Sequence, residues 1–289
     1  MMPFYGRFDH FQQAVESVLA QSDPDWRLVI VDDVYPDLAP GEWAQSLGDD
    51  RISYIRNETN LRPSRNYIKC VSLMQSDFAV LLGCDDALLP NYVSRVKELI
   101  TQFPAAAVIQ PGVSVIDGDG EAAAPLVDRV KALYRFHGVG ARAFSGEPLA
   151  KSLMRGNWTY FPSLVWRVSE LQKHGFRVDL DVVQDLAMLL EIIKGGGTLV
   201  LDDEVCFTYR RHGASVSAVT GPDGSKFAQE RILFGEASRD LTTLGWHHAA
   251  GAARIHLTSR LNALTDLPAA IKLGNVRGRR ALLRHIFGR

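Results

Sequence analysis

The sequence has few cysteines, and they form no pattern. Cys70, Cys84 and Cys206 lie far apart among 289 residues, with no C-x-x-C spacing. This arrangement suggests neither a disulfide framework nor a zinc site, so a reducing compartment is expected. No apolar run approaches the roughly 18–20 residues of a transmembrane helix, and the first residues lack the pattern of a signal peptide. We therefore expect a cytoplasmic globular protein.

The chain also lacks an excess of charge of either sign. Its 32 Lys+Arg and 33 Asp+Glu residues give a formal net charge of −1. The overall field therefore does not attract nucleic acid, and we expect no nucleic-acid partner. Glycine-rich phosphate motifs are missing as well, since no G-x-G-x-x-G follows a predicted strand and no Walker loop is present. These absences disfavour a dinucleotide-binding Rossmann site and a P-loop enzyme.

The charge balance conceals one basic segment, residues 272–289. It holds six Lys or Arg residues and no acid, interleaved with Leu282, Leu283, Ile286 and Phe287. This pattern is typical of a short helix on an anionic membrane surface, which would place the protein peripherally on the inner face of the membrane. A solvated helical end fits the same pattern equally well.

The order of predicted elements indicates an α/β fold. Short β-branched runs at 28–33, 52–55 and 78–82 alternate with helical stripes near 11–19, 67–74 and 90–103. Such alternation predicts a mostly parallel sheet flanked by helices. Since only Met1–Phe4 precede the first helix, the first strand of such a sheet is expected to be missing. Residues 118–150 read as a long irregular connection, and residues 226–287 as mostly helical. We expect an α/β half at 1–117, a second half of the same domain at 118–220 and a helical extension at 221–289.

Two predicted strands end in paired carboxylates, Asp32-Asp33 and Asp85-Asp86. Ligands of open parallel sheets bind outside the carboxyl ends of the strands. Two acidic pairs in one crevice repel each other unless a cation or donors offset them, and Mg²⁺ or Mn²⁺ suits such oxygen ligands. The alternative is that these residues cap the helices that follow them. For Asp32-Asp33 the capping role and the metal role are equally favoured. For Asp85-Asp86 the metal role is favoured over capping.

Other charged residues are candidates for the same edge of the sheet. Arg7, Arg62 and Arg65 lie in predicted loops there and could neutralise phosphates, although a single arginine is more often a solvated surface residue. Asp185 begins an otherwise apolar helix, as either a residue that favours the helix dipole or a general base. His212 follows two arginines, and this position suits a metal, a phosphate or a structural role.

Eight segments in order resemble glycosyltransferase family 2, a group of inverting, nucleotide-sugar-dependent enzymes with the GT-A fold. The matches cover residues 3 to 217, and each alone is weak. They are Pro3–Arg7 (P-x-Y-N-R), Glu16–Gln21 (S-[IV]-L-x-Q), Val29–Asp33 (V-V-D-D), Asn60–Asn66 (N-x-G-x-x-x-[AR]-N), Leu81–Pro90 (L-D-x-D-D-x-x-x-P, which contains the DxD motif), Phe161–Arg167, Gln184-Asp185 and Tyr209–His212.

The resemblance implies a role for each matching residue. It assigns Asp185 as the catalytic base and a manganese or magnesium ion as cofactor. The donor is a nucleoside-diphosphate sugar, the acceptor a glycan or a lipid-linked molecule, and the pathway cell-surface polysaccharide or glycolipid synthesis. The implied donor site consists of Pro3, Tyr5, Arg7, Asp32, Arg65, Asp85 and His212, and the implied metal ligands are Asp85, Asp86 and His212.

The sequence departs from the family pattern at several points. Gly83 replaces the first acid of the DxD motif, and Val34-Tyr35 replaces the usual Gly-Ser after the first acidic pair. A catalytically silent GT-A-like module that binds a nucleotide or a glycan is therefore the alternative function. A nucleotidyltransferase is a second rival, but Pro3–Arg7 is not the glycine-rich phosphate loop that such an enzyme needs.

Overall fold

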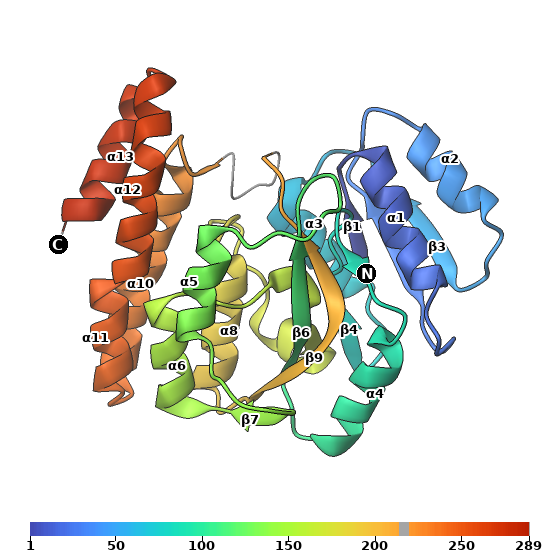
Figure 1. Cartoon of the computed structure of the whole chain (residues 1–289), viewed down its shortest axis with the longest axis horizontal. Coiled ribbons are helices and arrows are strands. Elements are labelled where there is room, and N and C mark those ends of the chain that lie inside the picture. The colour runs from blue at the N-terminus through green and yellow to red at the C-terminus, as the bar shows by residue number, and fades with distance from the viewer. Residues whose placement is uncertain (214–219, 289) are drawn as a thin grey trace.

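A computed structural model describes residues 1–213 and 220–288 of the chain. Residues 214–219 and Arg289, the last residue of the basic segment, lie outside this description. Figure 1 shows an α/β structure in which strands occupy the centre. Helices α1 and α2 flank one side, and helices α10 to α13 cover the opposite side. The expected α/β class and the helical C-terminal region are confirmed.

A parallel three-stranded sheet forms the N-terminal part. Its order is β1 (Met2–Phe4), β2 (Leu28–Asp32), β3 (Ile52–Arg56), and its connections carry α1 (Phe8–Leu19) and α2 (Ala39–Ser46), with α3 (Arg62–Ser72) following β3. All five residues of β2 are buried, because helices and neighbouring strands cover it on every side. This burial explains its continuous apolar run, which is typical of a strand inside a parallel sheet.

The expectation that the first strand is missing is wrong. Met2–Phe4 forms β1, which pairs in parallel with β2 from Met2↔Ile30 to Phe4↔Asp32. Met2 and Phe4 are buried, at 0% and 1% exposure, so two side chains suffice to anchor the strand. Three residues are too few for a periodic pattern, which is why the sequence did not reveal this strand.

The second sheet is mixed and continues the first. Its order is β4 (Phe78–Val80), β8 (Val165–Arg167), β6 (Val108–Ile116), β9 (Leu199–Arg210), β5 (Ala87–Leu88), with β7 (Arg142–Phe144) also paired to β9. The β6·β9 ladder is parallel and the others are antiparallel. Met1 joins the two sheets, since its amine donates to the Val80 carbonyl (2.9 Å) and its carbonyl accepts from Leu82 N–H (2.9 Å).

The expectation of an irregular connection over residues 118–150 is wrong. This stretch holds α5 (Leu126–Tyr134), β7 and the start of α6 (Gly146–Arg155). No residue of α5 is buried, so its apolar residues Leu126, Val130 and Leu133, which recur at helical spacing, do not anchor it in the core. The helix is held instead by Asp128, which accepts from the guanidinium of Arg211 and the hydroxyl of Tyr160. These partners come from distant parts of the chain.

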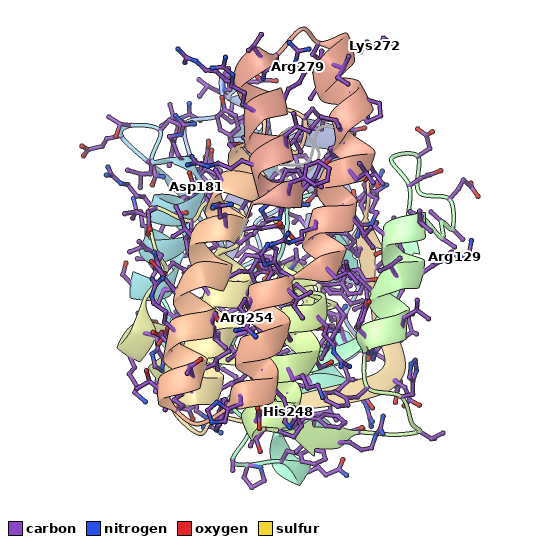
Figure 2. All side chains as sticks on the ribbon, turned by 90° about the vertical axis from the view of Figure 1, so that its left-hand side faces the viewer. Arg129, Asp181, His248, Arg254, Lys272 and Arg279 are labelled. Carbon is purple, nitrogen blue, oxygen red and sulfur yellow. The ribbon has the colours of Figure 1, made fainter. Side chains whose placement is uncertain are left out.

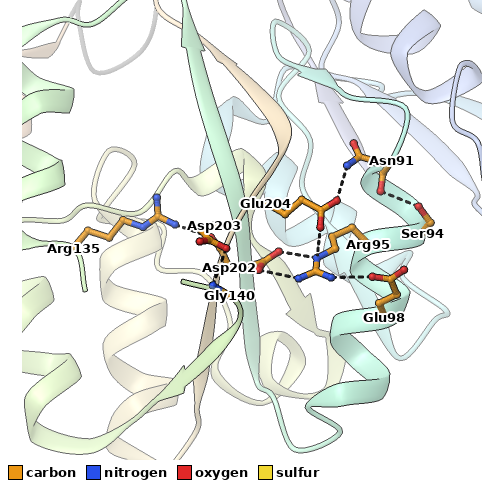
Figure 3. Close-up of polar contacts among 9 residues, drawn as sticks. All are labelled: Asn91, Ser94, Arg95, Glu98, Arg135, Gly140, Asp202, Asp203 and Glu204. Carbon is orange, nitrogen blue, oxygen red and sulfur yellow. Dashed lines mark hydrogen bonds and ion pairs between the residues drawn. The ribbon is translucent and has the colours of Figure 1, made fainter. Parts of the chain in front are cut away.

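A buried ion pair fixes α4 (Tyr92–Gln102) against β9 (Figure 3). Arg95 donates from Nε to Asp202 Oδ2 (2.8 Å) and from Nη2 to Asp202 Oδ1 (3.0 Å), and Glu98 and Glu204 also pair with it. The Asp202 side chain is fully buried. Asp202 lies where the β6–β9 register shifts, between the pairs Gln110↔Leu201 and Gly112↔Val205.

The remaining helices complete the core. They are a short 3₁₀ turn (Phe161–Ser163), α7 (Val168–His174), α8 (Gln184–Lys194), α10 (Ser225–Thr243), α11 (His247–Ile255), α12 (Leu257–Lys272) and α13 (Val276–Phe287). Helices α10 and α11 bury side chains such as Phe234 and Ala250 in the main core. Helices α12 and α13 share a small cluster with α10, which includes Phe227 and Leu282. None of the helices described has the length and apolarity to cross a membrane.

Candidate functional site

A cavity of about 1480 Å³ lies at the carboxyl ends of β1, β2 and β4. The end of β9 and helices α5, α8, α10 and α12 close its other sides. Most of the site residues expected from the sequence line it, and Asp32 and Arg65 do not. Those that do are Pro3, Tyr5, Arg7, Asp85, Asp86, Asp185 and His212.

The loop after β1 forms one end of the cavity. Tyr5 is 55% exposed, and its ring meets Tyr35 edge-on with 5.6 Å between centroids. An exposed aromatic ring in this position offers a face on which a planar ligand can stack. Arg7 pairs with Asp9, its Nε 3.0 Å from Oδ1, and both side chains are more than half exposed. Because exposed ion pairs are weak, Arg7 can exchange Asp9 for another anion.

The carboxylate of Asp32 is occupied by the protein itself. Its Oδ1 accepts from the Tyr35 backbone N–H (2.7 Å), and its Oδ2 accepts from the hydroxyl of Tyr54 and the guanidinium of Arg56. The side chain is fully buried. Asp32 therefore fixes the turn after β2, at a place beside the cavity rather than in its wall.

Asp33, the second carboxylate of the pair, does line the cavity. It accepts from the backbone N–H of Leu61 (2.6 Å) and of Arg62 (2.8 Å), so it attaches the loop before α3 to the end of β2. This attachment brings Arg62 into the cavity wall. Arg65 is exposed, one turn further along α3, and does not line the cavity.

Asp85 and Asp86 meet the end of β9 across the cavity. His212 Nε2 lies 2.7 Å from Asp85 Oδ2. Asp86 is 1% exposed, and its Oδ1 accepts from the Arg210 backbone N–H (2.8 Å). Its Oδ2 is buried with no hydrogen-bond partner among the described residues. Burial first, and then the charge of Asp85, raise the pKa of Asp86 well above its usual range.

These three residues fit a divalent cation by their chemistry. Carboxylate oxygens and an imidazole nitrogen are ligands for Mn²⁺, and Mg²⁺ takes oxygen ligands. The unpartnered Asp86 oxygen is the observation that favours an ion, because a buried acceptor without a donor is costly. Within the described ranges, no three His, Cys, Asp or Glu side chains already surround one point. The protein alone thus offers an incomplete ligand set, which the phosphate oxygens of a ligand could complete.

Gly83 leaves the space that the two carboxylates occupy. A Cβ atom at this position would lie 2.5 Å from Asp86 Oδ2 and 2.9 Å from Asp85 Oδ1. Real Cβ atoms do not approach other atoms so closely, so a side chain here would push the carboxylates away. Gly83 thus leaves room for both carboxylates at this position.

Arg210 holds this arrangement together, and sequence reasoning missed it. The side chain is 4% exposed, and it donates to the Asp85 carbonyl (2.8 Å) and to Gln13 Oε1 (2.6 Å). Its Nη1 also faces the carbonyls of Asp117 and Gly118. The only sequence signal was its place beside His212 in the segment Tyr209–His212.

Asp185 lies in the first turn of α8 and lines the same cavity as Asp85. Its Oδ2 accepts from Asn157 Nδ2 (2.9 Å). Burial raises the pKa of Asp185, and the Asn157 hydrogen bond is the largest interaction that lowers it. A carboxylate with a raised pKa inside a cavity is suited to accept a proton. Asn157 was not predicted as a site residue.

Two cations near Asp185 were also missed. Lys131 on α5 donates to the Thr159 carbonyl (2.7 Å) and lies 4.1 Å from the centre of the Tyr160 ring. Burial lowers the pKa of Lys131 to about 8. Arg211 pairs with Asp128 and also lines the cavity. No sequence pattern pointed to Lys131, because α5 itself was not predicted.

Comparisons with known proteins agree with these observations. The model of the family described as glycosyl transferase family 2 matches residues 1–149. EpsE of Bacillus subtilis, named as a glycosyltransferase, is 27% identical over 120 residues, which cover 41% of this chain and 43% of EpsE. WcaA of Escherichia coli, named as a colanic acid biosynthesis glycosyl transferase, is 30% identical over 105 residues, which cover 35% of this chain and 38% of WcaA. The matches thus span about two fifths of these relatives' lengths.

The solved structures extend the likeness to the whole fold. The crystal structure of Staphylococcus aureus TarS 1–349 in complex with UDP-GlcNAc superposes with a TM-score of 0.72. It covers 99% of this chain and 80% of that chain at 14% sequence identity. The complex of the same protein with UDP gives a TM-score of 0.59 at 13% identity, covering all of this chain and 91% of that one. Identities this low show the fold and no more.

Proposed function

The chain belongs to glycosyltransferase family 2, and we propose that it is an inverting glycosyltransferase. It moves a sugar from a nucleoside-diphosphate sugar to an acceptor hydroxyl, in cell-surface polysaccharide or glycolipid synthesis. The observation that carries the proposal is the cavity in which the Asp85–His212 pair and the partly buried carboxylate of Asp185 both lie in the wall. The names of EpsE and WcaA and the nucleotide complexes of TarS support the same reaction.

Donor binding belongs to the N-terminal end of the cavity. Tyr5 offers an aromatic face, and Pro3 of β1 lines the same end of the cavity. Arg7 offers a guanidinium whose exposed partner, Asp9, a phosphate can displace. Asp32 and Arg65 reach the nucleotide only if the loops around them shift, because neither lines the cavity. Arg62 and Asp33, which do line it, extend the proposed donor site.

Asp185 acts as the general base. It takes the proton from the acceptor hydroxyl while that oxygen forms a bond to the anomeric carbon. The bond from this carbon to the diphosphate oxygen breaks, and the nucleoside diphosphate leaves with the electron pair. One displacement inverts the anomeric configuration, through positive charge on the sugar ring as in other glycosyl transfers. The raised pKa of Asp185 supports this role.

Asp85, Asp86 and His212 would hold a divalent ion, Mn²⁺ or Mg²⁺. Such an ion stabilises negative charge on a departing diphosphate. Asp86 brings a buried oxygen that has no donor in the described part of the chain, and Arg210 keeps the Asp85 backbone in place.

Two measurements test the proposal. Thermal unfolding with UDP, GDP, CDP and dTDP, each with and without Mn²⁺, should show a metal-dependent rise for one nucleotide. A ligand at a hundred times its Kd stabilises the folded state by about 2.7 kcal/mol. Asp185→Asn should keep this rise and lose sugar transfer. If Asp185→Asn transfers sugar at the parent rate, Asp185 is not the base. If the folded parent protein responds to none of the nucleotides, the donor site is refuted, and a glycan-binding module is the function that remains.

We also propose that α13 binds an anionic membrane surface. Its exposed residues, Val276, Arg277, Arg280, Leu283, Arg284 and Phe287, recur at helical spacing on one face, and Leu282 and His285 are buried on the other. Figure 2 shows Lys272 and Arg279 at the end of the α12–α13 pair that projects beyond the rest of the fold. A face that mixes arginines with exposed apolar side chains is typical of helices that lie on anionic lipid. The bound protein would be peripheral.

Vesicle sedimentation tests the membrane proposal. Replacing Arg277, Arg280 and Arg284 by Gln should reduce sedimentation with vesicles that contain phosphatidylglycerol, because each basic residue near such a surface contributes about 1 kcal/mol. The matched control replaces Arg129 and Arg254, which are exposed on other helices. Equal sedimentation of all three proteins would contradict the proposal.

A further inference from the structure

A short turn at residues 181–183 leads into α8 and to the proposed base. Asp181 and Val182 line the cavity, and Asp185 lies two residues beyond the turn. The turn is closed by Gln184, whose Nε2 donates to the Asp181 carbonyl (3.1 Å). Because α8 continues directly from this turn, a displacement of the turn moves Asp185 as well.

The local sequence does not fix how α8 begins. Val183 stands at the position before the helix, and within the described residues no side chain caps its first turn. Helix starts are commonly fixed by a Ser, Thr, Asp or Asn side chain at this position. The placement of Asp185 in the first turn therefore depends on partners outside the helix.

One partner comes from α10, in the C-terminal part of the chain. Gln229 Oε1 accepts from the Val182 backbone N–H (2.9 Å). Two turns further along α10, Glu236 pairs with Arg177, in the same connection between α7 and α8. Figure 2 shows Asp181 close to α10. Helix α10 thus runs along the segment that leads to Asp185.

The other partner comes from α3, in the N-terminal part of the chain. The hydroxyl of Ser64 donates to Asp181 Oδ1, and Ser64 is 2% exposed. Its helix begins at Arg62, whose backbone N–H donates to Asp33 at the end of β2 (2.8 Å). Ser64 therefore connects the donor end of the cavity with the turn before Asp185.

Neither partner side chain lies in the cavity wall. Within the described part of the chain, the residues that line the cavity include Asp181 and Val182 but not Ser64 or Gln229. Any effect of these two residues on a reaction in the cavity must therefore pass through the turn. A displacement of about 1 Å at a reacting group can lower the rate about a hundredfold.

Resting on the function proposed above, we propose that Ser64 and Gln229 are positioning residues for Asp185. They hold the turn from two sides, Ser64 from the donor half and Gln229 from the C-terminal helices. Together they keep the Asp185 carboxylate within reach of Asn157 and in place relative to the donor. Helix α10 thus contributes to the reaction, although it lies outside the residues 1–149 that the family model matches.

Carboxyl carbon NMR of the full chain tests this inference without any substrate. Gln229→Met keeps the length of the side chain and removes the acceptor, so the turn loosens and the Asn157 hydrogen bond to Asp185 weakens. This bond lowers the pKa of Asp185 against the effect of burial, so we expect the pKa to rise by about 0.5 or more. Ser64→Ala should act in the same direction. Both variants retain Lys131, a nearby charge that lowers this pKa.

Two further variants are controls. Ser94 is the third residue of α4, as Ser64 is of α3, and its hydroxyl donates to the Asn91 carbonyl (3.0 Å) away from the cavity. Ser94→Ala should therefore leave the pKa of Asp185 unchanged. Gln229→Glu restores an acceptor for the Val182 N–H. Hydrogen exchange at this amide should be faster in Gln229→Met and return to the parent rate in Gln229→Glu.

Turnover gives a second readout that separates positioning from binding. Hydrolysis of UDP-glucose, GDP-mannose or dTDP-glucose is followed, with the compound whose nucleotide stabilises the protein in thermal unfolding. We expect kcat to fall about tenfold in Gln229→Met, with KM for the donor unchanged, because the donor contacts stay in place. Gln229→Glu should restore most of kcat at a pH above the acid limb.

An unchanged pKa of Asp185 in both Gln229→Met and Ser64→Ala would overturn the inference, and so would an equal rise in Ser94→Ala. A different result would count against the proposed function instead. If the pKa values change as expected but Asp185→Asn transfers sugar at the parent rate, the turn positions this carboxylate and the carboxylate is not the base. Urea unfolding shows whether each variant is folded. Gln229→Asn, whose shorter side chain withdraws the acceptor, replaces Gln229→Met if that variant does not fold.

Discussion

Removing the amide of Asn157 should shift the pH dependence of the reaction. Asn157 Nδ2 donates to Asp185 Oδ2 at 2.9 Å and stabilises the charged carboxylate. Burial raises the pKa of Asp185 while this hydrogen bond lowers it. In Asn157→Ala the lowering interaction is lost, so the pKa of Asp185 rises and the base is protonated at a higher pH.

The size of the shift follows from the strength of the bond. A hydrogen bond to a charged group is worth about 1.5–3 kcal/mol, and one pKa unit corresponds to about 1.36 kcal/mol. Water can enter the open cavity and replace part of the lost interaction, so the lower end applies. We expect the acid limb of kcat/KM to move up by about 1 pH unit.

Release of nucleoside diphosphate, followed over a range of pH, measures this limb. Carboxyl carbon NMR of Asp-labelled protein, assigned with Asp185→Asn, would give the same pKa without any turnover. Thr159→Val is the matched control, because Thr159 Oγ1 donates to the side-chain oxygen of Asn157, Oδ1, at 2.6 Å, whereas Asp185 accepts from the side-chain nitrogen, Nδ2. An acid limb that stays in place in Asn157→Ala, or one that moves equally in Thr159→Val, would refute the reasoning.

Three further predictions concern stability. Gly83→Ala should cost about 1–3 kcal/mol, since its Cβ would collide with Asp86, whereas Gly251→Ala on α11, with open space around it, should be neutral or stabilising. Urea unfolding distinguishes the two. Arg210→Lys should cost about 2 kcal/mol or more, because an ammonium cannot satisfy all the acceptors that the guanidinium reaches; unchanged unfolding and unchanged nucleotide binding would refute its positioning role. Burial lowers the pKa of His285 from its ordinary 6.5 to about 4, so the unfolded chain takes up this proton first as the pH falls. The free energy of unfolding should therefore fall from pH 6.5 to 4, by up to about 1.36 kcal/mol per pH unit, and less steeply in His285→Gln.

The elements with a strong periodic pattern were predictable. The apolar run before Asp32 gave β2, and the apolar segment that ends in three glycines gave α8. Elements stabilised by distant partners were not. Strand β1 is too short to show a pattern, and α5, none of whose residues is buried, is held in place by the bonds of Asp128 with Arg211 and Tyr160.

The same distinction, between what a local pattern predicts and what distant partners decide, applies to the residues of the cavity. The acids Asp85 and Asp86 could be placed from the sequence, because residues after parallel strands gather at one edge of the sheet. Asp32 satisfies the same rule, but the orientation of its side chain depends on Tyr54 and Arg56 of β3, so it lies outside the cavity wall. Adjacent carboxylates in one strand point to opposite sides, and their partners decide which one faces the ligand.

The sequence by itself therefore determined the α/β class, the family and the carboxylates at the strand ends, because these depend on local patterns and on the order of elements. Only the tertiary structure decided that Gly83 leaves room for two acids, that Arg210 anchors them and that Asn157 reaches Asp185. These contacts join residues that are far apart along the chain. The local sequence does not encode these contacts, because they result from how the two sheets and the helices pack against one another.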